Sequence, residues 1–114
     1  MKFKISHIAL LALLSISSPL FAAKMTTWSK ISQIVIHDWS GVIIYLEDTT
    51  AASAEGCSLK DRVLLEPTHY LFDIAYSSAL SSLHTNKTVR FFVDSCKPFG
   101  SETIPVLKRI DLLK

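Results

Sequence analysis

The stretch from Phe72 to Cys96 constrains the fold more than any other part of the chain, because it predicts a helix, a turn and a strand in immediate succession. Apolar residues recur at steps of three and four over 72–83, which is the spacing of one buried side of a helix. Beta-branched and aromatic residues over 88–94 then favour a strand. Asn86 falls where the period changes, and asparagine tolerates the left-handed conformation that ends many helices. The predicted apolar side comprises Phe72, Ala75, Tyr76, Ala79, Leu80 and Leu83, and the opposite side comprises Ser77, Ser78, Ser81 and Ser82.

The beginning of the chain has the pattern of a secretory signal peptide. Lys2 and Lys4 form a basic start, and the apolar run over 8–14 is too short to span a bilayer and is followed by small residues that suit a signal peptidase. An uncleaved membrane anchor is the alternative. We therefore predict residues 1–23 as a signal peptide and residues 24–114 as a single domain. The expected location is secreted or periplasmic, with no membrane span after the signal is removed.

Charge argues against nucleic acid as a partner. Loss of the signal removes Lys2 and Lys4, which leaves ten basic and ten acidic residues in a formally neutral mature chain. A protein that binds nucleic acid is expected to show a basic patch or stripe. Segments 60–62 and 108–111 instead mix both signs of charge.

Cys57 and Cys96 are the only cysteines in the sequence. A domain of about 90 residues buries a modest fraction of its surface and benefits from a covalent link. An exported chain reaches an oxidising compartment, so we predict a disulfide between the two cysteines. In the loop-entropy account, closing a loop of about 40 residues stabilises the fold by about 4 kcal/mol. The alternative is two free thiols or metal ligands, but a zinc site needs further ligands at close spacing, and His37, His69 and His84 are scattered.

The pattern of strand formers and turn residues predicts three strands, one helix and two strands. Closing such a sheet hides edges that a small exported protein would otherwise expose. We therefore predict a mainly β domain with one helix (α+β), folded as a small five-stranded OB-like Greek-key barrel. An open α+β sheet covered by one helix is the alternative. The strands are expected over 28–37, 42–46, 61–66, 88–94 and 103–113, with a loop over 48–56 and a turn over 97–101.

Short segments of the chain resemble the B subunits of subtilase-cytotoxin and typhoid-toxin type. The matching segments are 57–61, 76–80 and 86–91, and Ile31 to Ile34 is similar to part of the first strand of that family. The resemblance covers about half of the mature chain. It implies an exported bacterial OB-fold protein that assembles as a homo-pentamer and binds sialylated glycans.

The chain departs from that family in two places. The second-strand cysteine of the family has no counterpart over 42–47, and the sugar-contacting serine of the family falls closest to Ser29 or Thr27. The resemblance therefore implies Ser29 as a ligand-binding residue. A simpler relation to small exported proteins that share the fold implies no ligand.

Aromatic residues add two further candidates for ligand binding, Trp39 and Tyr45. An exposed aromatic ring can pack on the apolar side of a sugar, and Trp39 lies in a polar turn. For Trp28 and Tyr45, a place in the barrel core is the alternative. No Gly-x-Ser-x-Gly frame or glycine cluster occurs, so we expect no catalytic residue, metal or cofactor.

These observations favour a non-enzymatic binding module that recognises a glycan or another cell-surface or protein partner. A small periplasmic structural or interaction protein is the alternative. The two hypotheses differ in whether the ligand of the toxin B subunits is also expected for this chain, and the sequence alone supports both.

Overall fold

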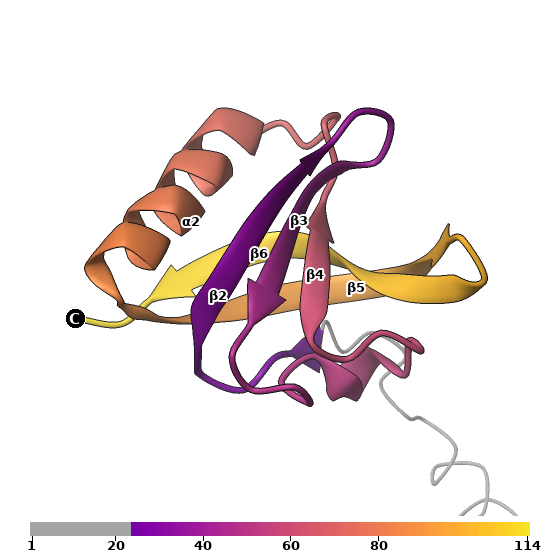
Figure 1. Cartoon of the computed structure of the whole chain (residues 1–114), viewed down its shortest axis with the longest axis horizontal. Helices are drawn as coiled ribbons and strands as arrows, with labels where there is room; N and C mark the ends of the chain where they lie inside the picture. The colour runs from indigo at the N-terminus through magenta and orange to yellow at the C-terminus, as the bar shows by residue number, and fades with distance from the viewer. Residues whose placement is uncertain (1–23) are drawn as a thin grey trace, which may run out of the picture.

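The computed structural model describes residues 24–114, and the predicted signal peptide lies outside these residues. The described part contains six strands, one α-helix and one short 3-10 helix (Figure 1). The prediction of a mainly β fold with one helix is confirmed. The elements are β1 (Lys24–Met25), β2 (Ser29–His37), β3 (Gly41–Leu46), η1 (Ser53–Glu55), β4 (Arg62–Leu65), α2 (Phe72–Thr85), β5 (Thr88–Phe99) and β6 (Glu102–Leu112).

The strands form one sheet in the order β1-β5-β2-β3-β4-β6, and β5 also pairs with β6. Every pairing is antiparallel except that of β4 with β6, which consists of a single parallel bridge between Leu64 and Val106. The pairings therefore run from β5 through β2, β3, β4 and β6 and return to β5. In Figure 1 the β2–β3–β4 strands cross in front of the long β5–β6 hairpin, and α2 lies along one side.

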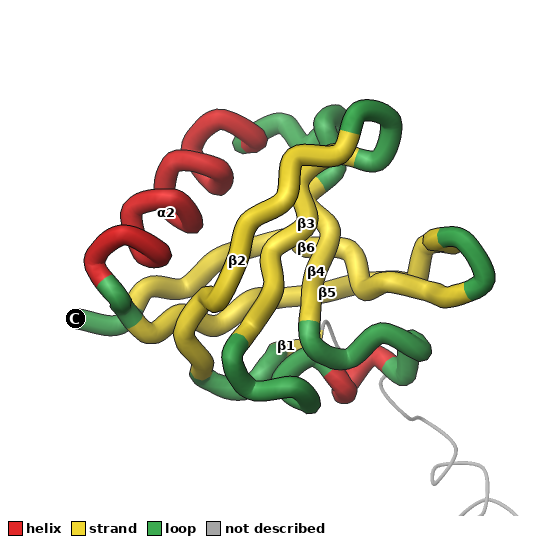
Figure 2. Tube along the Cα trace, in the orientation of Figure 1, coloured by secondary structure: helices red, strands yellow, loops and turns green. Residues whose placement is uncertain are grey.

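The structure corrects the predicted strands in number and in length. Residues 24–25, which lie before the first predicted strand, form β1 and pair with Phe92 and Val93 of β5, so the sheet has six strands and not five. The strand expected over 88–94 continues to Phe99, so only Gly100 and Ser101 remain as the turn. The tube in Figure 2 shows this hairpin reaching well beyond β4.

Helix α2 begins at Phe72 and ends where the sequence predicted. Asn86 has a φ of 57° and its N–H donates to the carbonyl oxygen of Leu83, so the left-handed cap is confirmed. The buried side is centred on Ala75, Ala79 and Ser82, because small side chains let the helix lie close to the sheet. The placement of Ser82 on the outer side was therefore wrong, and its buried hydroxyl donates to the Ser78 carbonyl.

Two apolar clusters hold the sheet together. The larger one combines side chains of β2 to β6 with Ala75 and Ala79 of α2, and Phe91, Val63 and Leu65 are among its fully buried members. The smaller one comprises Ile43, Leu64 and Ile104, with Val35, Tyr45, Leu59 and Phe99 packed against it. Because neighbouring residues of a strand point to opposite faces, β3 supplies Ile44 to the first cluster and Ile43 to the second.

The predicted disulfide is confirmed. Cys57 and Cys96 are bonded, with their Cα atoms 5.5 Å apart, which is a usual separation for a disulfide. Cys57 is buried and Cys96 is exposed. No helix within residues 24–114 is long and apolar enough to cross a membrane.

Two arginine side chains, one from β5 and one from β6, stack on aromatic rings and share one aspartate. We call this group the arginine ladder. The guanidinium of Arg90 lies 4.4 Å from the ring centre of Trp28, and that of Arg109 lies 4.0 Å from the ring centre of Phe92. Asp111 accepts hydrogen bonds from both arginines, at 2.8 Å from Arg109 Nε and 3.0 Å from Arg90 Nη2. The hydrogen bond from Arg109, followed by that from Arg90, lowers the pKa of Asp111. Trp28 is therefore an exposed ladder residue and not a core residue.

The different burial of Leu65 in β4 and Leu80 in α2 predicts that replacing each by alanine has a different effect on stability. Leu65 is fully buried in the larger cluster, so Leu65→Ala should lower the free energy of unfolding by about 2 to 5 kcal/mol through lost transfer energy and a cavity. Leu80, which the helical pattern placed on the buried side, is 36% exposed, so Leu80→Ala should cost less than about 1 kcal/mol. Urea denaturation measures both values, and an equal loss for the two variants would contradict the observed packing.

The arginine ladder predicts a dependence of stability on pH. Because the folded-state pKa of Asp111 is lowered, its contribution is present above the unfolded pKa of about 3.9 and is lost as pH falls through the folded pKa. Asp111→Asn should therefore lower stability at pH 7 by up to about 1 kcal/mol and make the fall between about pH 5 and pH 2 shallower. Denaturation at pH 7 and pH 3 tests this, and an unchanged acid slope would argue against the assignment.

Candidate functional site

The candidate site is a cleft of about 440 Å³ between the β2–β3 turn and the outer part of the β5–β6 hairpin. Two segments about sixty positions apart in sequence form its sides, and Leu64 of β4 also contributes. The lining residues are His37, Trp39, Ser40, Leu64, Lys97, Pro98, Phe99 and Gly100. We call this set of residues the binding cleft, as a name for the candidate site.

The β2–β3 turn is short because Gly41 can adopt a conformation that other residues disfavour. Its φ is +119°, and a Cβ at this position would lie 2.4 Å from the carbonyl oxygen of Leu65. Gly41 pairs with His37 across the hairpin, so the chain reverses over residues 38–40. The turn therefore presents Trp39 at its tip, where the side chain is 81% exposed.

Aromatic rings from both segments line the binding cleft. The His37 and Trp39 rings meet edge to face, with centroids 5.1 Å apart and an angle of 80°. The His37 ring also contacts Phe99, at a centroid distance of 5.9 Å. Such an array offers apolar faces in two orientations, and the exposed indole carries a hydrogen-bond donor at its edge. This combination suits a ligand that has both apolar C–H surfaces and hydroxyl groups.

Polar groups at the edges of the cleft could orient such a ligand. Lys97 forms an ion pair with Glu66, at 2.5 Å between Nζ and Oε2, which holds the lysine beside the cleft. His37 Nδ1 lies 3.7 Å from Asp38 Oδ1, beyond hydrogen-bond length, and this buried nitrogen has no hydrogen-bond partner among the described residues. The cleft therefore combines a cation, an imidazole and the Ser40 hydroxyl with its aromatic surface.

The smaller apolar cluster fixes the opposite side of the cleft. The part of the β5–β6 hairpin over residues 96–105, which we call the hairpin arm, turns at Gly100 and Ser101. Phe99 and Ile104 of the arm pack on Ile43 and Leu64 of the β3–β4 pair. The arm is thus held against the outer face of the sheet, and Pro98 and Phe99 face the Trp39 turn across the cleft.

The three residues predicted to bind a ligand lie in different places, and only Trp39 lines the binding cleft. Ser29 is 7% exposed, and its hydroxyl donates to Lys30 O and accepts from Asp48 N–H. Ser29 and His37 lie at opposite ends of β2, so roughly 25 Å separates them at the rise of an extended strand. Tyr45 is half-buried, with Arg62 over its ring at 4.4 Å and Arg62 Nη1 donating to its hydroxyl. The structure thus gives Ser29 and Tyr45 local structural contacts.

Sequence reasoning missed His37, Lys97 and Phe99 as cleft residues. The sequence shows His37 only as one of three histidines too scattered for a zinc site, and it places the other two residues in the predicted turn over 97–101. Their proximity to Trp39 comes from the fold of the hairpin arm, which no local pattern reports. The one available signal was a large aromatic residue within the polar sequence 38–41.

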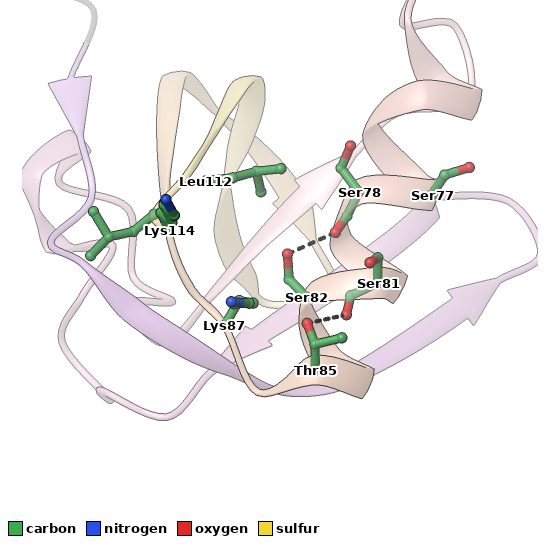
Figure 3. Close-up of a pocket in the computed structure, with 9 residues that line it drawn as sticks. Ser77, Ser78, Ser81, Ser82, Thr85, Lys87, Leu112 and Lys114 are labelled. Carbon is green, nitrogen blue, oxygen red and sulfur yellow. Dashed lines mark hydrogen bonds between the residues drawn. The ribbon is translucent and has the colours of Figure 1, made fainter.

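Two further hollows lie along α2. One of about 600 Å³ runs between the serine-rich side of the helix and the end of β6, and Lys87 also lines it (Figure 3). The hydroxyls of Ser82 and Thr85 donate to helical carbonyls one turn earlier, as the dashed lines in Figure 3 mark. The other, of about 410 Å³, is lined by Leu71, Ile74 and Leu107 among others.

Residues 24–114 hold no group of three or more histidine, cysteine or acidic side chains that is arranged to bind a metal ion. Comparison of the chain with known protein families, with curated proteins and with solved structures finds no match in any of the three. The described residues form a small disulfide-linked β domain with one helix.

Proposed function

We propose that the protein is an exported, non-enzymatic binding module of the OB type that binds a glycan in the binding cleft. The observation that carries the proposal is Trp39, a large aromatic side chain that is 81% exposed and stands beside a preformed cleft. A single exposed aromatic of this kind suits stacking on the C–H face of a sugar ring. Lys97, Ser40 and the indole N–H would then bond to hydroxyl or carboxylate groups of the ligand.

The strand pairings support the OB-type assignment. An OB fold is a five-stranded Greek-key barrel that binds oligosaccharides or oligonucleotides near the loops after its first and fourth strands. With β1 set aside, the loops in those positions are the β2–β3 turn and the tip of the hairpin arm. The binding cleft lies between these two loops. The formally neutral mature chain favours a glycan over a nucleic acid.

The resemblance to toxin B subunits suggests that the module works as a homo-pentamer. The disulfide is consistent with an exported protein, because such bonds persist in oxidising compartments. A ring of identical subunits would present several copies of the binding cleft to one cell surface, which raises avidity without any new contact.

A small periplasmic interaction protein is the second candidate function, and one observation favours it. The apolar hollow beside α2 is lined by Tyr70, Ile74 and Leu112, all of which are exposed. Apolar residues gathered in this way mark a contact surface for another protein. In the pentamer proposal the occupant is a second copy of this chain, and in the alternative it is an unrelated protein.

Binding of a glycan is tested with Trp39→Ala and Trp28→Phe on a glycan array and by tryptophan fluorescence. Trp39→Ala should weaken binding by about 2 kcal/mol or more, because it removes the central aromatic contact. Trp28→Phe keeps Trp39 as the only tryptophan, so its emission should shift when a glycan that is bound on the array is added. Ser29→Ala is a control that should bind normally. Undiminished binding by Trp39→Ala, or the absence of any array signal for the wild type, would count against the proposal.

Assembly is tested by sedimentation velocity. We expect the wild type to sediment as a pentamer and Ile74→Asp to sediment as a monomer, because a buried unpaired charge at the apolar hollow opposes association. Ile36→Asp is a matched control, since Ile36 is similarly exposed (71%, against 64% for Ile74) but does not line this hollow. A wild-type protein that remains monomeric at high concentration would exclude the pentamer.

A further inference from the structure

The hairpin arm leaves the main part of the sheet at a β-bulge. Val93 pairs with Leu107 and Cys96 pairs with Pro105, so β5 has one more residue than β6 between these pairs. Ser95 within the bulge has a φ of 67°, a conformation that residues other than glycine rarely adopt. A bulge bends its strand and redirects the residues beyond it. The direction of the arm, and with it one side of the binding cleft, is therefore set at 94–95.

One neighbouring segment holds this bulge in place. This segment comprises residues 55–59, which precede β4, and it makes two contacts with the bulge. Cys57 is bonded to Cys96, and Glu55 Oε1 accepts a hydrogen bond of 3.0 Å from the Ser95 N–H. Ser95, which has the unusual backbone conformation, is thus held by its own hydrogen bond to a carboxylate and by the disulfide at the next residue.

The same segment holds the arm farther out. The Ser58 N–H donates to Thr103 Oγ1 at 2.8 Å, and the Thr103 N–H donates to Ser58 Oγ at 2.7 Å. The Leu59 N–H donates to the Thr103 carbonyl oxygen at 2.9 Å. Thr103 pairs with Pro98, which lines the binding cleft. Residues 55–59 therefore bind the arm at two points along its length, Cys96 and Thr103.

We propose that residues 55–59 are a clamp that positions the cleft-lining side of the hairpin arm, and that the Cys57–Cys96 bond and the Ser58–Thr103 pair are its two fastenings. The larger apolar cluster contains none of the four residues, so the ring of strands does not depend on them for its packing. The clamp therefore acts on the site through the arm, and its residues are positioning residues. The functional part of this inference rests on the proposed function, but the positioning itself can be measured without a ligand.

Amide hydrogen exchange tests the clamp in the free protein. The variants are Cys57→Ala/Cys96→Ala, which removes the covalent fastening, and Thr103→Val, which removes the acceptor of the Ser58 N–H. In each variant the amides of residues 97 and 99–103 should exchange at least about tenfold faster relative to the amides of Ile44 and Phe91 in the main core. Normalising to the core amides separates local release of the arm from a general loss of stability.

Thr103→Ser is the conservative control. It keeps the hydroxyl, so exchange in the arm should remain close to the wild-type rate. Thr103→Val also preserves the disulfide, which keeps the test valid even if the double cysteine variant does not fold. The proposal is overturned if arm and core amides accelerate in the same proportion in Thr103→Val, because the pair would then act only through overall stability.

Binding to the glycan array tests whether the clamp affects ligand binding in the cleft. Thr103→Val should reduce the signal of glycans that the wild type binds by about tenfold, which is the effect expected from a misplaced cleft side, and Thr103→Ser should restore it. The two failures are distinguishable: a wild type without array signal refutes the proposed function while the exchange experiment still decides the clamp. Released arm amides combined with full glycan binding would refute the role of the clamp in the site.

Discussion

The long β5–β6 hairpin is the constraint on which the rest of the structure depends. Its inner part pairs with β2 and β4 and so completes the ring of strand pairings around the larger apolar cluster. Its outer part packs on the opposite face of β3 and β4 and forms one side of the binding cleft. One antiparallel pair therefore serves both the core and the site, and the bulge at 94–95 is the point where its role changes.

The covalent and polar contacts around that bulge explain how a small domain can carry a protruding hairpin. An extended hairpin alone is marginally stable in water. Here Phe99 and Ile104 bury apolar surface against the sheet, and the disulfide ties Cys96 to a buried partner. The opposite end of the same hairpin carries the arginine ladder around Asp111, which joins β5 to β6 by charge and by stacking on aromatic rings. Each end thus has its own means of stabilisation.

Much of the fold could be predicted from local pattern, and most of the site could not. The change of period at Asn86 located the end of α2, and the isolated cysteines identified the disulfide. The helical pattern did not predict which residues of α2 are buried, because burial there depends on packing against the sheet. Ser82 is buried because small residues let α2 approach the sheet, while Leu80 lies at the surface. Pro98 lies in the segment that the sequence predicts as a turn, yet it pairs with Thr103 inside the hairpin, while Pro105 lies beside the bulge. The cleft joins residues 37–40 to 97–100, and only Trp39 among them carried a local signal.

The single parallel bridge between β4 and β6 has a consequence for how the chain acquires its structure during synthesis. Strands β2, β3 and β4 can pair as soon as they emerge, because each lies next to its neighbour in sequence. The outer partners of this three-stranded unit, β5 and β6, are made last. Until then β2 and β4 present open edges, which are sites of unwanted association. The nascent domain therefore exposes the unpaired edges of β2 and β4 until β5 and β6 emerge.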